Sequence, residues 1–134
     1  MINSSTKTTL KFLAAGLAAA AIVMTADTTL AEFIDAVLRR LRIADRFAVV
    51  RSAETEPWGK PHPAIFLTTA AALAVPPTAC LVFEDSLPGL IAAKAARMAC
   101  VCVPESCPDH DPRFVLADAC LPSLEAVSDA LLGA

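Results

Sequence analysis

The sequence has few of the features that nucleic-acid-binding and membrane-spanning proteins need. Its 134 residues include no tyrosine and one tryptophan, and its 11 lysines and arginines are spread along a chain of net charge −3. Without a basic stripe or a set of stacking aromatic rings, nucleic acid is not an expected partner. An apolar run over residues 12–24 is shorter than the roughly 20 residues of a transmembrane helix, so a membrane is not an expected partner either.

The five cysteines lack the spacing of a zinc site. Cys100 and Cys102 alternate along a predicted strand, whereas Cys80, Cys107 and Cys120 stand apart. We interpret them as small buried hydrophobic residues in the reducing cytoplasm, where disulfides are rare. The alternative, a soft-metal site formed by Cys100, Cys102 and Cys107, lacks a histidine partner at helical or hairpin spacing.

The amino-terminal region allows two interpretations. Two lysines precede the apolar run and small residues follow it, which is the pattern of a secretory signal and would make this an exported protein without residues 1–26. Alternatively, residues 1–19 are an irregular or helical leader, and a buried strand over residues 20–24 begins a single domain of residues 20–134. The second interpretation is favoured because the segments that follow complete an α/β unit.

Strand and helix patterns alternate along the chain. With 56% hydrophobic and 19% charged residues, the composition is that of a packed globular domain. The alternation predicts an α/β fold, in which helices wrap a parallel sheet through right-handed crossovers. The predicted strands cover residues 20–24, 47–51, 81–83, 99–103 and 117–121, and the predicted helices cover residues 30–42, 64–74, 87–98 and the segment from Ser123 onward.

Two adjacent carboxylates follow the apolar strand of residues 81–83. Glu84 and Asp85 would emerge together at the carboxyl edge of a parallel sheet, where α/β folds bind ligands, and Ser86 would cap the next helix. Lys60 lies one helix and one strand upstream, so it can face the same crevice. A lysine suits a phosphate and paired carboxylates suit Mg²⁺, whereas the alternative is a solvated acidic pair with an exposed loop lysine.

Five segments together resemble the haloacid dehalogenase superfamily. They are Gly-Lys-Pro-His-Pro at 59–63, Phe-Glu-Asp-Ser-x-x-Gly at 83–89, Ala-Ala-Lys-Ala-Ala-Arg-Met at 92–98, and the tail segments 111–118 and 121–124. The resemblance covers everything after the leader and is strongest to the branch of sugar-phosphate phosphatases, hexitol phosphatases and β-phosphoglucomutases. It implies a three-layer α/β/α Rossmann-like fold, a small phosphorylated metabolite as substrate, and Mg²⁺-dependent hydrolysis through an aspartyl-phosphate.

The resemblance also implies roles for individual residues. Thr25, at the end of a strand, would offer a hydroxyl to the phosphoryl group, and Lys60 would neutralise the phosphoryl oxygens. Asp85, with Glu84 beside it, would bind Mg²⁺. Structural roles would fall to residues that shape the loop and the helix start, namely Gly89, His62 and Ser86.

One motif of that family is missing from the sequence. The family begins catalysis from an Asp-x-Asp-Gly-Thr strand, and neither residues 22–30 nor Asp109-His-Asp111, in a proline-rich turn, provides one. The chain therefore resembles the second half of such an enzyme, without the nucleophile strand or the cap domain, and we expect it to be inactive alone. The chain must then close the gap in the sheet, leave unpaired edges open to self-association, or recruit a strand from another chain. The alternative is a non-catalytic binding or interaction module.

Overall fold

The structure is a computed structural model of the whole chain. It describes residues 11–15, 19–24, 28–105, 111–128 and 131. Within these ranges, no helix is long and apolar enough to cross a membrane.

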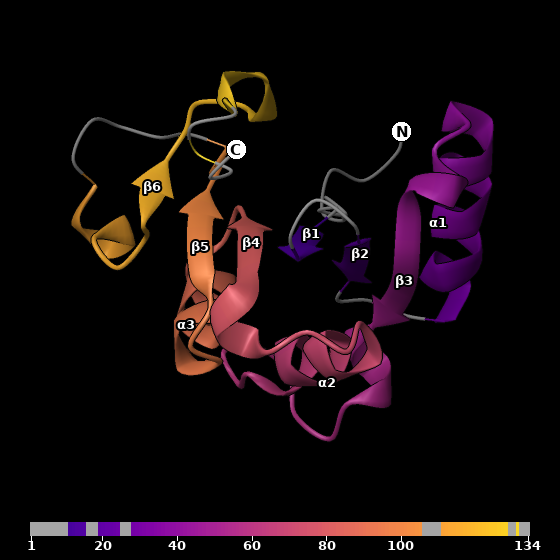
Figure 1. Cartoon of the computed structure of the whole chain (residues 1–134), viewed down its shortest axis with the longest axis horizontal. Helices are drawn as coiled ribbons and strands as arrows, with labels where there is room; N and C mark the ends of the chain where they lie inside the picture. The colour runs from indigo at the N-terminus through magenta and orange to yellow at the C-terminus, as the bar shows by residue number, and fades with distance from the viewer. Residues whose placement is uncertain (1–10, 16–18, 25–27, 106–110, 129–130, 132–134) are drawn as a thin grey trace, which may run out of the picture.

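A six-stranded sheet organises the described residues, with strand order β3-β2-β1-β4-β5-β6 (Figure 1). Neighbouring strands run parallel except that β1 is antiparallel to both β2 and β4. The α/β fold predicted from the alternating patterns is confirmed. The bounds are β1 Lys11–Ala15, β2 Ala19–Met24, α1 Thr28–Leu41, β3 Phe47–Ser52, α2 Ala64–Ala72, β4 Cys80–Glu84, α3 Leu87–Ala95, β5 Ala99–Cys102 and β6 Ala119–Cys120.

Helices α2 and α3 cover one face of the sheet over a shared hydrophobic core. Alternate residues of a strand face the same side, so Val82 of β4 and Cys100 of β5 both point into this core. There they meet Ile65 and Phe66 of α2 and Leu90 of α3, all essentially inaccessible to solvent. Helix α1 lies beside β3, at the far end of the sheet from β6 (Figure 1).

The cysteines are mostly buried, as predicted. Cys80, Cys100 and Cys102 are buried thiols, and a hydrogen bond to Cys102 together with burial raises the pKa of the Cys100 thiol. Cys120, at the edge strand β6, is exposed, so the prediction of a buried residue is wrong there. Cys107 lies outside the described residues.

Strand β1 corrects the prediction for the amino-terminal leader and for the sheet. The segment expected to be irregular or helical includes a strand over Lys11–Ala15, and this strand closes the gap in the sheet, which was one of the three expected alternatives. Phe12 lies opposite Ile22 of β2 and Phe83 of β4, so both inner edges are paired. An alanine-rich apolar run is compatible with a helix or a buried strand, and here the open hydrogen-bonding groups of β2 and β4 favour a strand.

The carboxyl-terminal segment also differs from the prediction. A helix was expected from Ser123, but the segment begins with a short 3₁₀ turn, Leu124–Ala126, and helical conformation is described only at Leu131. The tail is held instead by Asp118, whose carboxylate accepts hydrogen bonds of 2.7 Å from the Lys94 amine and from the Cys100 N–H. The Asp118 N–H in turn donates to the Cys100 carbonyl at 2.9 Å. These bonds continue the pairing of β5 with the tail.

Candidate functional site

The candidate site begins where β4 ends in Glu84. Along this strand Cys80, Val82 and Glu84 face the side covered by α2 and α3, so the Glu84 carboxylate is carried into the protein interior. Its side chain is 0% exposed, which is unusual for a carboxylate unless it has partners. Asp85 follows with a half-buried side chain.

Lys60 is the cationic partner of Glu84. The Lys60 amine donates to Glu84 Oε1 in a short contact, and the Lys60 side chain is only 5% exposed. The amine also lies 4.8 Å from the centre of the Phe66 ring, on α2, in a cation–π contact. The structure therefore brings together Lys60 and Glu84, 24 residues apart in the chain, as the sequence predicted.

The start of α3 holds the second oxygen of the Glu84 carboxylate. Ser86 Oγ donates to Glu84 Oε2 at 2.9 Å and accepts from the Gly89 N–H at 3.2 Å, so Ser86 is the predicted helix cap. A β-carbon on Gly89 would lie 1.9 Å from Glu84 Oε2. Position 89 is therefore glycine because the carboxylate packs directly against the first turn of α3.

The loop that carries Lys60 is ordered by local contacts. The centre of the His62 ring lies 4.8 Å from that of the Trp58 ring, and its Nδ1 accepts from the Ala64 N–H at 3.2 Å. The backbone N–H of His62 donates to the Gly59 carbonyl at 3.0 Å. The peptide bond between Lys60 and Pro61 is cis. These contacts support the predicted structural role of His62, which shapes the turn just before α2.

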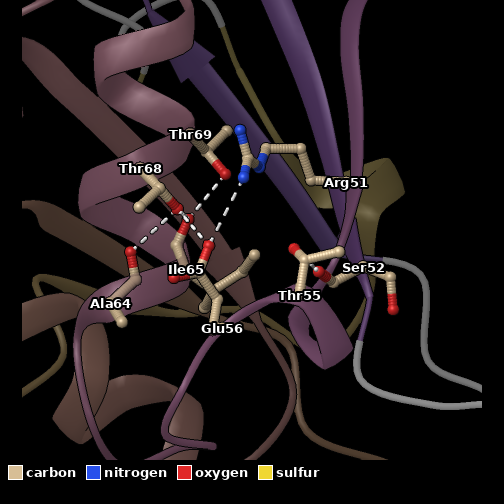
Figure 2. Close-up of polar contacts among 8 residues, drawn as sticks. All are labelled: Arg51, Ser52, Thr55, Glu56, Ala64, Ile65, Thr68 and Thr69. Carbon is tan, nitrogen blue, oxygen red and sulfur yellow. Dashed lines mark hydrogen bonds and ion pairs between the residues drawn. The ribbon is translucent and has the colours of Figure 1, made fainter.

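A second polar cluster, which the sequence did not reveal, joins β3, the loop and α2. Glu56, with a side chain 5% exposed, accepts a 2.5 Å hydrogen bond from Thr68 Oγ1 and lies 3.5 Å from the Arg51 guanidinium (Figure 2). No periodic pattern marks these three residues. A pairing of opposite charges across the end of β3, Arg51 with Glu56, was the one signal that could have suggested it.

The described residues provide only part of a Mg²⁺ site. Mg²⁺ takes oxygen ligands in octahedral geometry, usually from one or two carboxylates with waters and substrate oxygens. Glu84 has one oxygen bonded to Lys60 and the other to Ser86. Within the described ranges, no group of three or more histidine, cysteine, aspartate or glutamate side chains is placed to hold a metal ion. Asp85 and Glu84 therefore remain predicted Mg²⁺ ligands that would need further oxygen donors.

The predictions for Thr25 and for the Asp109-His-Asp111 segment fall wholly or mostly outside the described residues. Thr25 lies outside the described residues, although the strand that leads to it, β2, is next to β3 with Met24 opposite Ser52. Of the Asp109-His-Asp111 segment, only Asp111 is described. It caps a 3₁₀ turn and forms a 2.6 Å ion pair with Arg113, which agrees with a turn rather than a catalytic pair.

The chain is similar to known phosphatases and phosphomutases. A family model described as haloacid dehalogenase-like hydrolase matches residues 2–97. Hexitol phosphatase B of Escherichia coli strain K12 is 46% identical over 101 residues, which are 75% of this chain and 46% of that protein. Beta-phosphoglucomutase of Bacillus subtilis is 44% identical over 72 residues, or 54% of this chain and 32% of that enzyme.

A solved structure gives the same result for the fold. The crystal structure of beta-phosphoglucomutase from Clostridium difficile matches with a TM-score of 0.63 and 30% identity, covering 73% of this chain and 42% of that one. The chain spans less than half the length of each of these three relatives.

Proposed function

Because the chain belongs to the haloacid dehalogenase-like hydrolase family, we propose that it carries the phosphate-binding side of a phosphatase site. The substrate class is a small phosphomonoester, in particular a sugar phosphate, since similar proteins include a hexitol phosphatase and a beta-phosphoglucomutase. The observation that carries this proposal is the meeting of Lys60 with Glu84 at the carboxyl end of β4, one residue before Asp85.

Lys60 is suited to a phosphoryl oxygen in this setting. An ammonium group has three N–H donors, so it can donate to Glu84 and still donate to a phosphate. Glu84 favours the charged form of the amine and fixes its direction, while the Phe66 ring supports the same cation from α2. A preoriented cation of this kind stabilises the charge that spreads over phosphoryl oxygens during transfer. In this proposal Thr25 supplies a hydroxyl from the end of β2.

Covalent catalysis needs a further carboxylate at the phosphorus atom. The strand beside β4 is β1, Lys11–Ala15, which contains no acidic residue and runs antiparallel to its neighbours. We therefore propose that the described residues bind a phosphate ester without turning it over at the rate of a full phosphatase. Mg²⁺ binding, with Asp85 as one ligand, would likewise need a carboxylate from outside the described cluster.

The lack of an acidic residue in β1 also favours a second candidate function, a phosphate-binding or interaction module without catalysis. In this candidate β1 completes the sheet, and the pair of Lys60 and Glu84 remains as a ligand site. Self-association would then use the outer strands β3 and β6, since the inner edges are paired.

Ligand binding and turnover distinguish the two candidates. We would titrate the purified chain with glucose 6-phosphate and with inorganic phosphate, following backbone amide shifts by NMR, and assay a phosphomonoester panel with Mg²⁺ or with EDTA. We expect shifts around residues 59–63 and 84–89 that are lost in Lys60→Met. Turnover that requires Mg²⁺ and is abolished in Asp85→Asn would establish a phosphatase and reject the module. Absence of shifts at millimolar ligand would reject phosphate binding in both forms.

A further inference from the structure

Glu56 is a buried carboxylate in a loop, outside the cluster around Glu84. Its side chain is 5% exposed, and burying a carboxylate is costly unless it is paired and hydrogen-bonded. In Figure 2 the side chains of Arg51, from β3, and Thr68, from α2, both reach toward the Glu56 carboxylate. Thr68 Oγ1 donates to Glu56 Oε1 at 2.5 Å, and Arg51 Nη2 lies 3.5 Å from the same oxygen.

These contacts join three elements at one atom. Arg51 belongs to β3, Glu56 to the loop that leaves it, and Thr68 to the middle of α2. The loop starts from a compact turn, in which the Glu56 N–H donates to the Ala53 carbonyl at 3.1 Å and Thr55 Oγ1 donates to the Ser52 carbonyl at 3.0 Å. The Glu56 side chain therefore attaches this turn to α2.

Lys60 lies four residues after Glu56 and contacts the same helix. Its amine is over the ring of Phe66, two residues before Thr68. The segment from Glu56 to Lys60 is thus held to α2 at both ends, by Thr68 at one end and by Phe66 at the other. A loop fixed at two points loses the freedom to move Lys60 away from β4.

We propose that Glu56 is a positioning residue, which Arg51 and Thr68 hold on α2 so that the loop delivers the Lys60 amine to Glu84. The placement of Lys60 follows from the contacts alone, and its use in binding phosphate rests on the function proposed above.

The test measures how well Lys60 is protected. Acetylation of the folded chain with acetic anhydride, followed by mass spectrometry of peptides, gives the labelling rate of Lys60 relative to Lys94. Lys60 is 5% exposed and Lys94 is 32% exposed, so the ratio is low in the unaltered chain. We expect Glu56→Gln and Thr68→Val to raise this ratio about tenfold, the size expected when a hydrogen bond to a buried charged group is lost.

Neighbouring variants separate positioning from a general loss of stability. Thr69→Val removes a buried hydroxyl that donates to the Ile65 carbonyl of the same helix at 2.6 Å, and it should leave the ratio unchanged at similar stability. Thr68→Ser keeps the hydroxyl and should restore protection. The proposal would be overturned if the labelling ratio of Lys60 to Lys94 in Thr68→Val and Glu56→Gln were the same as in Thr69→Val.

This readout is independent of phosphate. Suppose that Thr68→Val loses the protection of Lys60 and that the unaltered chain binds no phosphate ester. The positioning role would then stand, and only the proposed phosphate site would be rejected. Suppose instead that Glu56→Gln binds phosphate at full affinity and that its Lys60 stays protected. Only the positioning role would then be rejected.

Discussion

The carboxylate of Glu84 occupies the space that a side chain at position 89 would fill. A β-carbon built on Gly89 would lie 1.9 Å from Glu84 Oε2 and 2.0 Å from its Cδ. Because Glu84 is also bonded to Lys60 and Ser86, it cannot move aside without breaking the cluster. The glycine in this motif is therefore required by packing and not by backbone conformation.

Gly89→Ala should destabilise the fold strongly. The added methyl group must displace a buried, hydrogen-bonded carboxylate, so we expect a loss of about 2–3 kcal/mol in the free energy of unfolding, as for overpacked cores. Urea denaturation measures it. Gly59→Ala is the matched control, since a β-carbon there has no atom within 4 Å. Equal effects of the two variants would contradict the packing argument.

The buried pair of Lys60 and Glu84 should show strong coupling. Lys60→Met leaves a buried carboxylate without its cation, so we expect a loss of about 3–5 kcal/mol in the free energy of unfolding. Glu84→Gln should have a comparable effect, and the double variant should be clearly more stable than the sum of the two losses implies. Additive losses in a double-mutant cycle would show that the pair does not interact.

The attachment of the tail by Asp118 should weaken in acid. Burial acts to raise the pKa of the Asp118 carboxyl, but hydrogen bonds from Lys94 and the Cys100 N–H outweigh it and hold that pKa below its ordinary value. A lowered folded-state pKa means that this stabilisation is present above the unfolded pKa of about 4 and is lost as pH falls through the folded value.

Asp118→Asn isolates this contribution. The variant should lose stability at pH 7 but show a shallower decrease in stability between pH 5 and pH 2, measured by urea unfolding. The effect is modest because half of the Asp118 side chain is exposed. Asp35→Asn, which removes an exposed pair with Arg39, is the control. A pH profile of Asp118→Asn parallel to that of the unaltered chain would rule out the linkage.

Strand β1 should be essential for solubility. Leu13 lies opposite Ala21 of β2 and Val82 of β4, so Leu13→Pro interrupts pairing on both sides of a central strand. We expect the variant to aggregate or to associate through the opened edges, as measured by light scattering after size-exclusion chromatography. A monodisperse variant with the same mass as the unaltered chain would contradict the placement of β1 in the sheet.

The parts of the molecule that sequence patterns predicted are those determined locally. Helix α1 has a clear helical period, and the strand before Glu84 is bounded by turn residues and a helix cap, so both were predicted nearly to their ends. The meeting of Lys60 with Glu84 followed from parallel strands sharing an edge.

The parts that were missed depend on distant neighbours. An alanine-rich run such as residues 11–15 does not specify a strand by itself. It forms a strand here because it pairs with β2 on one side and with β4 on the other. Glu56 lies in a loop, and no local pattern indicates its burial, because that burial depends on Arg51 and Thr68 from two other elements. The segment from Ser123 was expected to be helical at once, whereas the described residues begin with a 3₁₀ turn at Leu124–Ala126.

The reversed direction of β1 determines how the protein can be handled. Since Lys11 lies opposite Val23, near the carboxyl end of β2, the chain enters β1 from the same sheet edge that carries the Glu84 cluster. An epitope fused directly ahead of Lys11 would therefore begin at the sheet edge that carries the Glu84 cluster.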